Sequence, residues 1–198
     1  MDDLRLLQVT IEGIRQAIQH NGRLADPMNV IAKQKKAITA KRTKTDKDYH
    51  DLMRLDWEGS LYIEGNRVVW PAVNIERMYL DAAAKKRRKK DAERAIEIEA
   101  SAPIEYDGPT DWTELWDDDR FRFVRGVKIP GNRTTVITCR PIFPIGWRCT
   151  WVVLYNPSVI NESDVREWTE VAGSQVGLSD WRPKYGRFKI INFKPLKD

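Results

Sequence analysis

The chain has few of the residues on which most enzymes rely. Its 198 residues include two cysteines and two histidines. Cys139 and Cys149 show neither a metal-ligand spacing nor a disulfide framework, and no serine or cysteine nucleophile motif lies near His20 or His50. The sequence also lacks a phosphate-binding loop motif and a dinucleotide-binding glycine fingerprint. We therefore expect a protein without a catalytic residue, a metal site or a cofactor.

Long apolar runs are missing too. No stretch approaches the ~18 apolar residues that a membrane-spanning helix needs. The acidic start Met1-Asp2-Asp3 lacks the basic and apolar regions of a signal peptide. These features predict a soluble, cytoplasmic protein. The length permits a hydrophobic core, and no low-complexity linker divides the chain, so we expect one domain over residues 1–198, with insertions at about 26–57 and 101–119.

Charge is unevenly distributed, although the net charge is only +5. Basic residues concentrate in 33–47 and 85–94. Such runs are usually solvated surfaces, but a long basic insertion is costly to order without a partner. Six successive cations at 85–90 also exceed what a helix dipole needs. We expect both segments to contact nucleic acid, through Lys33, Lys35, Lys36, Lys41, Arg42, Lys44, Lys85, Lys86, Arg87 and Arg88.

The segment 105–119 has the opposite character, since it contains acidic residues and tryptophans but no lysine or arginine. Consecutive aspartates rarely converge on one ion, so we do not expect a metal site here. We interpret the segment as an exposed loop whose tryptophans pack on the body of the protein or on a neighbouring molecule. As a protein interface, it would use Trp112, Trp116, Asp117, Asp118 and Asp119.

Hydrophobic periodicity predicts an α+β fold. Strands are expected at 4–12, 95–100, 121–129, 134–143, 147–155 and 188–193, and a hairpin at 59–69 with a further turn at Pro130-Gly131-Asn132. Helices are expected at 45–57, 71–86 and 161–176. Cys139 and Cys149 would lie near each other, as small buried residues, across an antiparallel pair. Without the insertions, the order is that of a ferredoxin-like or RRM-like antiparallel sheet with two main helices.

The connection 177–188 combines two glycines and a proline with aromatic and basic residues. Glycine permits a positive φ or a close approach to a ligand, and cations beside aromatic rings suit a phosphate backbone with unstacked bases. The alternative is a rigid turn in which Trp181 covers the core. The residues expected to bind nucleic acid here are Trp181, Arg182, Lys184, Tyr185 and Arg187.

Two segments resemble the RAMP (repeat-associated mysterious protein) superfamily of CRISPR effector complexes. Residues 177–188 resemble the glycine-rich loop before the last strand of that family. Residues 61–75, with Trp70-Pro71-Ala72-Val73-Asn74-Ile75, resemble the strand-to-helix junction of its backbone subunits. The resemblance implies a ferredoxin-like fold, repeated copies along a guide RNA, and an insertion after the first strand that reaches over the nucleic acid.

Some RAMP proteins cleave RNA with an aspartate of that insertion. The resemblance does not choose among Asp26, Asp46, Asp48 and Asp51, so we do not transfer the activity to this chain. The sequence thus leads to two hypotheses. In the first, the protein is a sequence-tolerant subunit that binds single-stranded RNA, or DNA, and assembles in multiple copies as a homo-oligomer or ribonucleoprotein. In the second, it is a phage-encoded interaction or structural protein, such as a CRISPR inhibitor or virion component, that acts through its acidic tryptophan loop.

Overall fold

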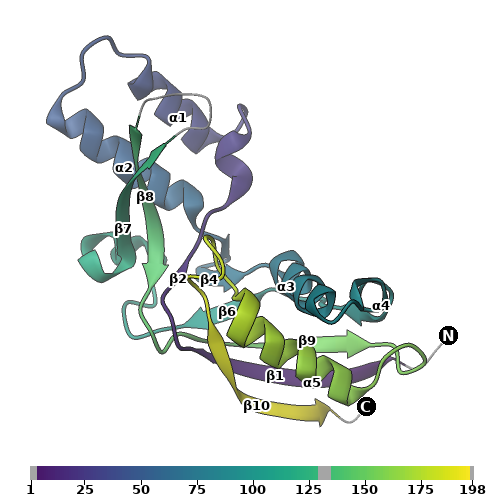
Figure 1. Ribbon diagram of the computed structural model, residues 1–198. Helices are drawn as coiled ribbons and strands as arrows, with labels where there is room; N and C mark the ends of the chain where they lie inside the picture. The colour runs from purple at the N-terminus through teal and green to yellow at the C-terminus, as the bar shows by residue number, and fades with distance from the viewer. Residues whose placement is uncertain (1–3, 129–134, 197–198) are drawn as a thin grey trace.

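The computed structural model describes residues 4–128 and 135–196 as an α+β protein with two antiparallel sheets (Figure 1). The larger sheet has the strand order β10 (Phe188–Leu196), β1 (Arg5–Gly13), β9 (Arg148–Tyr155), β6 (Ala102–Glu105), β4 (Arg67–Trp70) and β3 (Ile63–Glu64). The short β5 (Ile96–Glu97) also pairs with β9. The smaller sheet has the order β2 (Ala17–Ile18), β8 (Thr135–Phe143) and β7 (Arg122–Lys128).

Two long helices, α3 (Ala72–Lys85) and α5 (Glu162–Val171), lie on the same face of the larger sheet, and the short α4 (Lys89–Ala95) follows α3 (Figure 1). Tyr79 of α3 joins the three elements. Its ring centroid is 6.4 Å from that of Trp151 on β9, and its hydroxyl lies 3.0 Å from the hydroxyl of Thr169 on α5. Burial raises the pKa of Tyr79 to about 12, so the hydroxyl stays protonated. We call this sheet with its three helices the sheet body.

Strand β1 shows why the body folds as it does. Leu7, Val9 and Ile11 alternate along it and are at most 1% exposed, as expected for a strand with one face under helices. The strand lies in the interior of the sheet, between β10 and β9. Its pairing with β10 brings Leu6 opposite Leu196 at one end and Gly13 opposite Phe188 at the other.

The remaining elements project from the body as a second unit (Figure 1). It consists of α1 (Val30–Thr39), α2 (Asp46–Ser60), β7 and β8, and we call it the arm. Thr45 caps α2 in a capping box with Asp48. Trp57 of α2 is 1% exposed, and its Nε1–H donates to the Phe121 carbonyl at 2.8 Å. The insertion expected to order only with a partner therefore contains two helices in the unbound chain.

The predicted helices at 45–57, 71–86 and 161–176 and the hairpin at 59–69 are confirmed in place. Asn161 caps α5 in a second capping box. The strand expected at 95–100 is reduced to β5, and β6 was not predicted. The turn expected at 130–132 lies outside the described residues. Within the described parts of the chain, none of the helices is long and apolar enough to cross a membrane.

The predicted pairing of the two cysteine-bearing strands is wrong. Strand β8, with Cys139, pairs with β7 and β2, whereas β9, with Cys149, pairs with β1, β5 and β6. The two thiols belong to different sheets because β8 is part of the smaller sheet and β9 is part of the larger one. Both are buried, and burial raises the pKa of Cys139 to about 12 and that of Cys149 well above its usual value.

Candidate nucleic-acid interface

The glycine-rich loop (177–188) is closed at its base by its two glycines. Gly177 and Gly186 have φ values of +83° and +74°, and the Leu178 N–H donates to the Gly186 carbonyl at 2.8 Å. A Cβ atom at Gly186 would lie 2.4 Å from the Leu178 carbonyl oxygen. Both the dihedral angles and the close approach therefore require glycine. The loop is a fixed structure rather than a flexible flap.

Hydrogen bonds fasten this loop to the segment around β2. The Ile18 N–H donates to Ser179 Oγ at 2.7 Å, and the Asp180 N–H donates to the Ile18 carbonyl at 2.8 Å. A third bond runs from the Gly186 N–H to the Gln16 carbonyl at 2.8 Å. Because β2 follows β1 and pairs with β8, the loop sits at the junction of the sheet body and the arm.

An aromatic and cationic cluster joins the loop to the arm. The Phe123 ring of β7 lies 5.5 Å from Trp181 and 5.6 Å from Tyr185, measured between centroids. The guanidinium carbons of Arg125 and Arg140 lie 5.4 and 5.2 Å from the Trp181 centroid. Trp181 has φ +53°, which is unfavourable outside glycine and is held here by these contacts. The Trp181 indole packs on strands β7 and β8 and is not part of the buried core.

Two grooves flank the loop and bring distant basic residues together. In the first, Lys85 at the end of α3 and Arg182 of the loop line the same depression. In the second, Lys184, Tyr185 and Arg187 meet Arg15, which follows β1. These grooves contain all the loop residues predicted to bind nucleic acid. Arg15 was missed because it is isolated in the sequence, and only the fold places it beside the loop.

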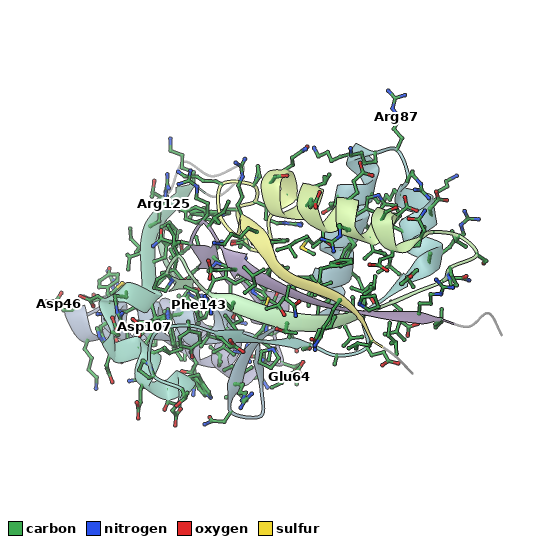
Figure 2. All side chains as sticks on the ribbon, turned by 90° about the horizontal axis from the view of Figure 1, so that it is seen from below. Asp46, Glu64, Arg87, Asp107, Arg125 and Phe143 are labelled. Atoms are coloured by element: carbon green, nitrogen blue, oxygen red, sulfur yellow. The ribbon has the colours of Figure 1, made fainter. Side chains whose placement is uncertain are left out.

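The basic run 85–90 is divided between internal and free cations. Lys86 pairs with Glu167 at 2.7 Å. Arg88 pairs with Asp91 at 2.9 Å and with Asp164, and lies 5.3 Å from the Trp168 ring centroid; its hydrogen bond to Asp91 is the main reason its pKa is raised. Lys85 and Arg87 form no ion pair with any described residue, and Figure 2 shows Arg87 pointing away from the molecule.

In the basic segment of the arm (33–47), some cations likewise form ion pairs within the chain and others do not. Lys35 pairs with Asp56, and Lys41 pairs with Asp48 at 2.5 Å. The hydrogen bond from Lys41 is the main cause that lowers the pKa of Asp48 to about 2. The Lys44 ammonium donates to the Lys41 carbonyl at 2.9 Å. The cations of this segment that are exposed and form no ion pair within the described ranges are Lys33, Lys36, Arg42 and Lys47.

The acidic segment packs on its own chain, with Trp116 against α2 of the arm. Trp116 is 5% exposed, and its ring meets the Trp57 ring edge-on at 5.6 Å. Trp112 is partly buried against the core. Carboxylates of this segment form ion pairs, Asp118 with Arg120 and Asp119 with Arg122, while Asp117 is exposed. Of the two arrangements considered from the sequence, the structure shows packing within the chain, so Trp116 offers no exposed interface anchor.

The aspartates that the family resemblance singled out in the insertion have visible local roles. Asp48 completes the cap of α2, the Asp26 carboxylate accepts from the Met28 N–H at 2.8 Å, and Asp51 lies 4.0 Å from His50. Asp46 stands in the first turn of α2. Across residues 4–128 and 135–196, no group of three or more histidine, cysteine, aspartate or glutamate side chains could hold a metal ion.

Comparison with known proteins assigns no family. No protein-family model matches the chain, and none of the curated proteins matches it.

Proposed function

We propose that this protein binds single-stranded nucleic acid, RNA in preference to DNA, across the glycine-rich loop, and that copies repeat along one strand. The observation that carries the proposal is the pair of grooves on either side of a rigid loop. They collect Lys85 with Arg182 on one side, and Arg15 with Arg187 on the other. A strand that crosses the loop would meet cations before and after it.

The chemistry of the grooves favours a sequence-tolerant partner. Arginine and lysine bind phosphates without reading the base. Lys184 is exposed and forms no ion pair with any described residue, while the exposed Arg182 shares the Asp81 carboxylate with Arg77. Tyr185 is partly exposed between the loop and its groove, and an aromatic face accepts any base by stacking.

We also propose that the body has a ferredoxin-like core. Support comes from the order β10-β1-β9-β6, in which every neighbouring pair is antiparallel. Helix α3 falls between β1 and β6 along the chain, and α5 falls between β9 and β10. This is the arrangement expected of a split β-α-β unit, and it agrees with the RAMP resemblance of the sequence.

The binding proposal is tested by fluorescence anisotropy with labelled single-stranded RNA and DNA of unrelated sequences. Affinity should fall linearly with salt on a log–log plot. Arg182→Ala with Lys184→Ala should weaken binding about equally for every sequence and reduce the slope by roughly two, one for each lost phosphate contact. A matched control, Arg5→Ala with Lys194→Ala, removes two exposed cations outside both grooves and outside the basic segments. Equal losses in the two variants would show that only net charge matters and would overturn the site.

The repeated-copy part of the proposal has its own test. Because Trp116 is buried, the acidic segment can be altered without unfolding only at exposed carboxylates such as Glu114 and Asp117. If unlike charges join successive copies, Glu114→Lys with Asp117→Lys should lower the mass that assembles on a long strand, as measured by light scattering. An unchanged mass would remove this segment from the contact.

A further inference from the structure

A pocket opens in the larger sheet where strands β4 and β6 separate. Within the described chain the pairing of these strands ends at Val69 opposite Pro103, although β4 extends to Arg67 and β6 to Glu105. The pocket has a volume of about 530 Å³, within the ~300–1,000 Å³ that sites for small molecules usually measure. It shares no lining residue with either groove beside the glycine-rich loop.

The pocket lies on the face of the sheet that α3 and α5 leave uncovered (Figure 1). Thr150 of β9 lines it, and the two neighbours of Thr150 along the strand, Cys149 and Trp151, are buried. Trp151 contacts Tyr79 of α3. Because alternate side chains of a strand point to opposite faces, Thr150 points away from the helices. The pocket is therefore open to a ligand from the uncovered side.

A fixed aromatic side chain forms one wall. Tyr106 lines the pocket, and its ring centroid lies 5.4 Å from that of Phe121 and 5.2 Å from that of Phe143. Burial, and then the charge of Asp111, raise the pKa of Tyr106, so the hydroxyl stays protonated. That hydroxyl forms no hydrogen bond with a described residue. Aliphatic side chains from both strands also line the pocket, so its shape and lining suit a flat, largely apolar ring.

Two side chains of opposite charge line the pocket from opposite strands. Arg67 belongs to β4 and Glu105 to β6. Both are exposed, and neither side chain forms an ion pair or a hydrogen bond with a described residue. Continued from Val69 opposite Pro103, the register would place them as a cross-strand pair, where opposite charges normally meet. The separation of the strands keeps them apart, with the pocket between them.

The neighbouring carboxylates have partners elsewhere. Glu64, opposite Arg67 on β3, accepts from the Ser101 hydroxyl. Asp107, which follows the aromatic wall, pairs with Arg120 at 3.3 Å. The guanidinium and the carboxylate that line the pocket therefore both remain available to a ligand that offers acceptors on one side and donors on the other.

We propose that this pocket binds one guanine base. Guanine has two adjacent N–H donors on its Watson–Crick edge, which match the two oxygens of a carboxylate, and it has the acceptors O6 and N7, which match a guanidinium. The other bases of RNA lack the adjacent donor pair. Glu105 accepts from the first edge, Arg67 donates to the second, and the ring packs on Tyr106.

The choice of a nucleobase as ligand rests on the proposed function. The grooves beside the loop bind phosphates of any sequence, and the pocket adds one position at which the base is read. The guanine belongs either to the bound strand or to a free nucleotide, and the experiment separates these two sources.

The first arm of the test is isothermal titration calorimetry with guanosine monophosphate and inosine monophosphate, which differ only in the N2 amino group. Inosine monophosphate should bind about tenfold more weakly, because one hydrogen bond to a charged group is lost. Glu105→Gln should remove this difference. Glu97→Gln, the same substitution at an exposed position of β5 outside the pocket, should preserve it. Arg67→Ala should weaken both nucleotides alike, because both retain O6 and N7.

The second arm is fluorescence anisotropy with an oligouridine strand that carries one central guanine, compared with the same strand carrying inosine at that position. A preference for the guanine strand that Glu105→Gln abolishes and Glu97→Gln preserves assigns the pocket to a base of the bound strand. The same preference among the monophosphates alone assigns it to a free nucleotide. Either result supports the inference.

The outcomes also separate the inference from the function on which it rests. If the strands bind with the expected salt dependence but neither arm distinguishes guanine from inosine, the inference is wrong and the proposed function stands. The same conclusion follows if Glu105→Gln and Glu97→Gln behave alike. If guanosine monophosphate binds in preference to inosine monophosphate while no strand binds, the pocket stands and the proposed function fails.

Discussion

Different interactions stabilise the sheet body and the arm. In the body, α3 buries a continuous face that includes Ile75, Met78 and Tyr79, all 0% exposed. In the arm, α1 has no buried residue, and its partner α2 is tied to basic residues by the pairs of Asp56 and Asp48. Apolar burial is worth far more than partly exposed ion pairs. The arm should therefore open at a lower free energy than the body.

Strand β1 of the body and the β7–β8 hairpin of the arm show the same difference. Strand β1 is paired on both edges and has one face buried, while the outer part of the β7–β8 hairpin exposes Val124 and Ile137 at 53% and 58%. Exposure on that scale leaves little packing to hold the hairpin in one position. A stable body thus carries a less stable arm, and the glycine-rich loop is fastened to both.

The largest expected effect tests the strength of the body. Tyr79→Ala should lower the free energy of unfolding by about 3–5 kcal/mol, because it leaves a cavity between α3, β9 and α5. Ile38→Ala in α1, whose side chain is half-buried, should cost less than about 1 kcal/mol. Urea denaturation followed by tryptophan fluorescence measures both. Similar losses of unfolding free energy in the two variants would contradict the expected difference in stability between the body and the arm.

The next effect concerns the loop between the two units. Gly186→Ala should cost roughly 3 kcal/mol, since an unfavourable φ is combined with a clash against the Leu178 carbonyl. Gly65 has φ +60° with nothing within 4 Å of an added Cβ, so Gly65→Ala isolates the dihedral cost at about 1–2 kcal/mol. The difference between the two melting curves measures the close approach alone. If the two variants melt together, the loop is not closed as described.

The smallest effect is the pH dependence of the arm. The folded-state pKa of Asp48, about 2, is lower than its usual 3.8, so its contribution to stability is present above pH 3.8 and is lost as the pH falls toward 2. Between these values, wild type should lose more stability than Asp48→Asn. Asp46→Asn, two residues earlier in the first turn of α2 and without an ion pair to any described residue, should follow wild type. If wild type and both variants lose the same amount of stability as the pH falls, the pH-dependent contribution assigned to Asp48 is wrong.

The elements of the body were predicted better from the sequence than those of the arm, because burial of one face of a helix or strand imposes a regular spacing on its apolar residues. The alternation of Leu7, Val9 and Ile11 and the three- and four-residue steps of α3 follow directly from the faces they bury. Helix α1 buries nothing completely, so its pattern is weak. The prediction paired β8 with β9, its neighbour in sequence. In the structure β8 pairs with its other neighbour β7 on one edge and with β2, a two-residue strand without a signal of its own, on the other.

The candidate site was predicted in parts. Lys85 was recognised as part of the basic run 85–90, and Arg182 and Arg187 as part of the glycine-rich loop, but no local pattern indicates that Lys85 and Arg182 share a groove. Arg88, which appeared equivalent to Lys85, is instead an internal ion-pair residue.

The pairing of β1 with β10 has a practical consequence. With Leu6 opposite Leu196 and Gly13 opposite Phe188, both ends of the described chain lie at the end of the β1–β10 pair that is opposite to the glycine-rich loop (Figure 1). A fluorophore, affinity handle or surface tether fused at either end would therefore leave the loop and its grooves unobstructed. Immobilised protein should behave as it does in free solution, so surface-based and single-molecule assays suit this molecule.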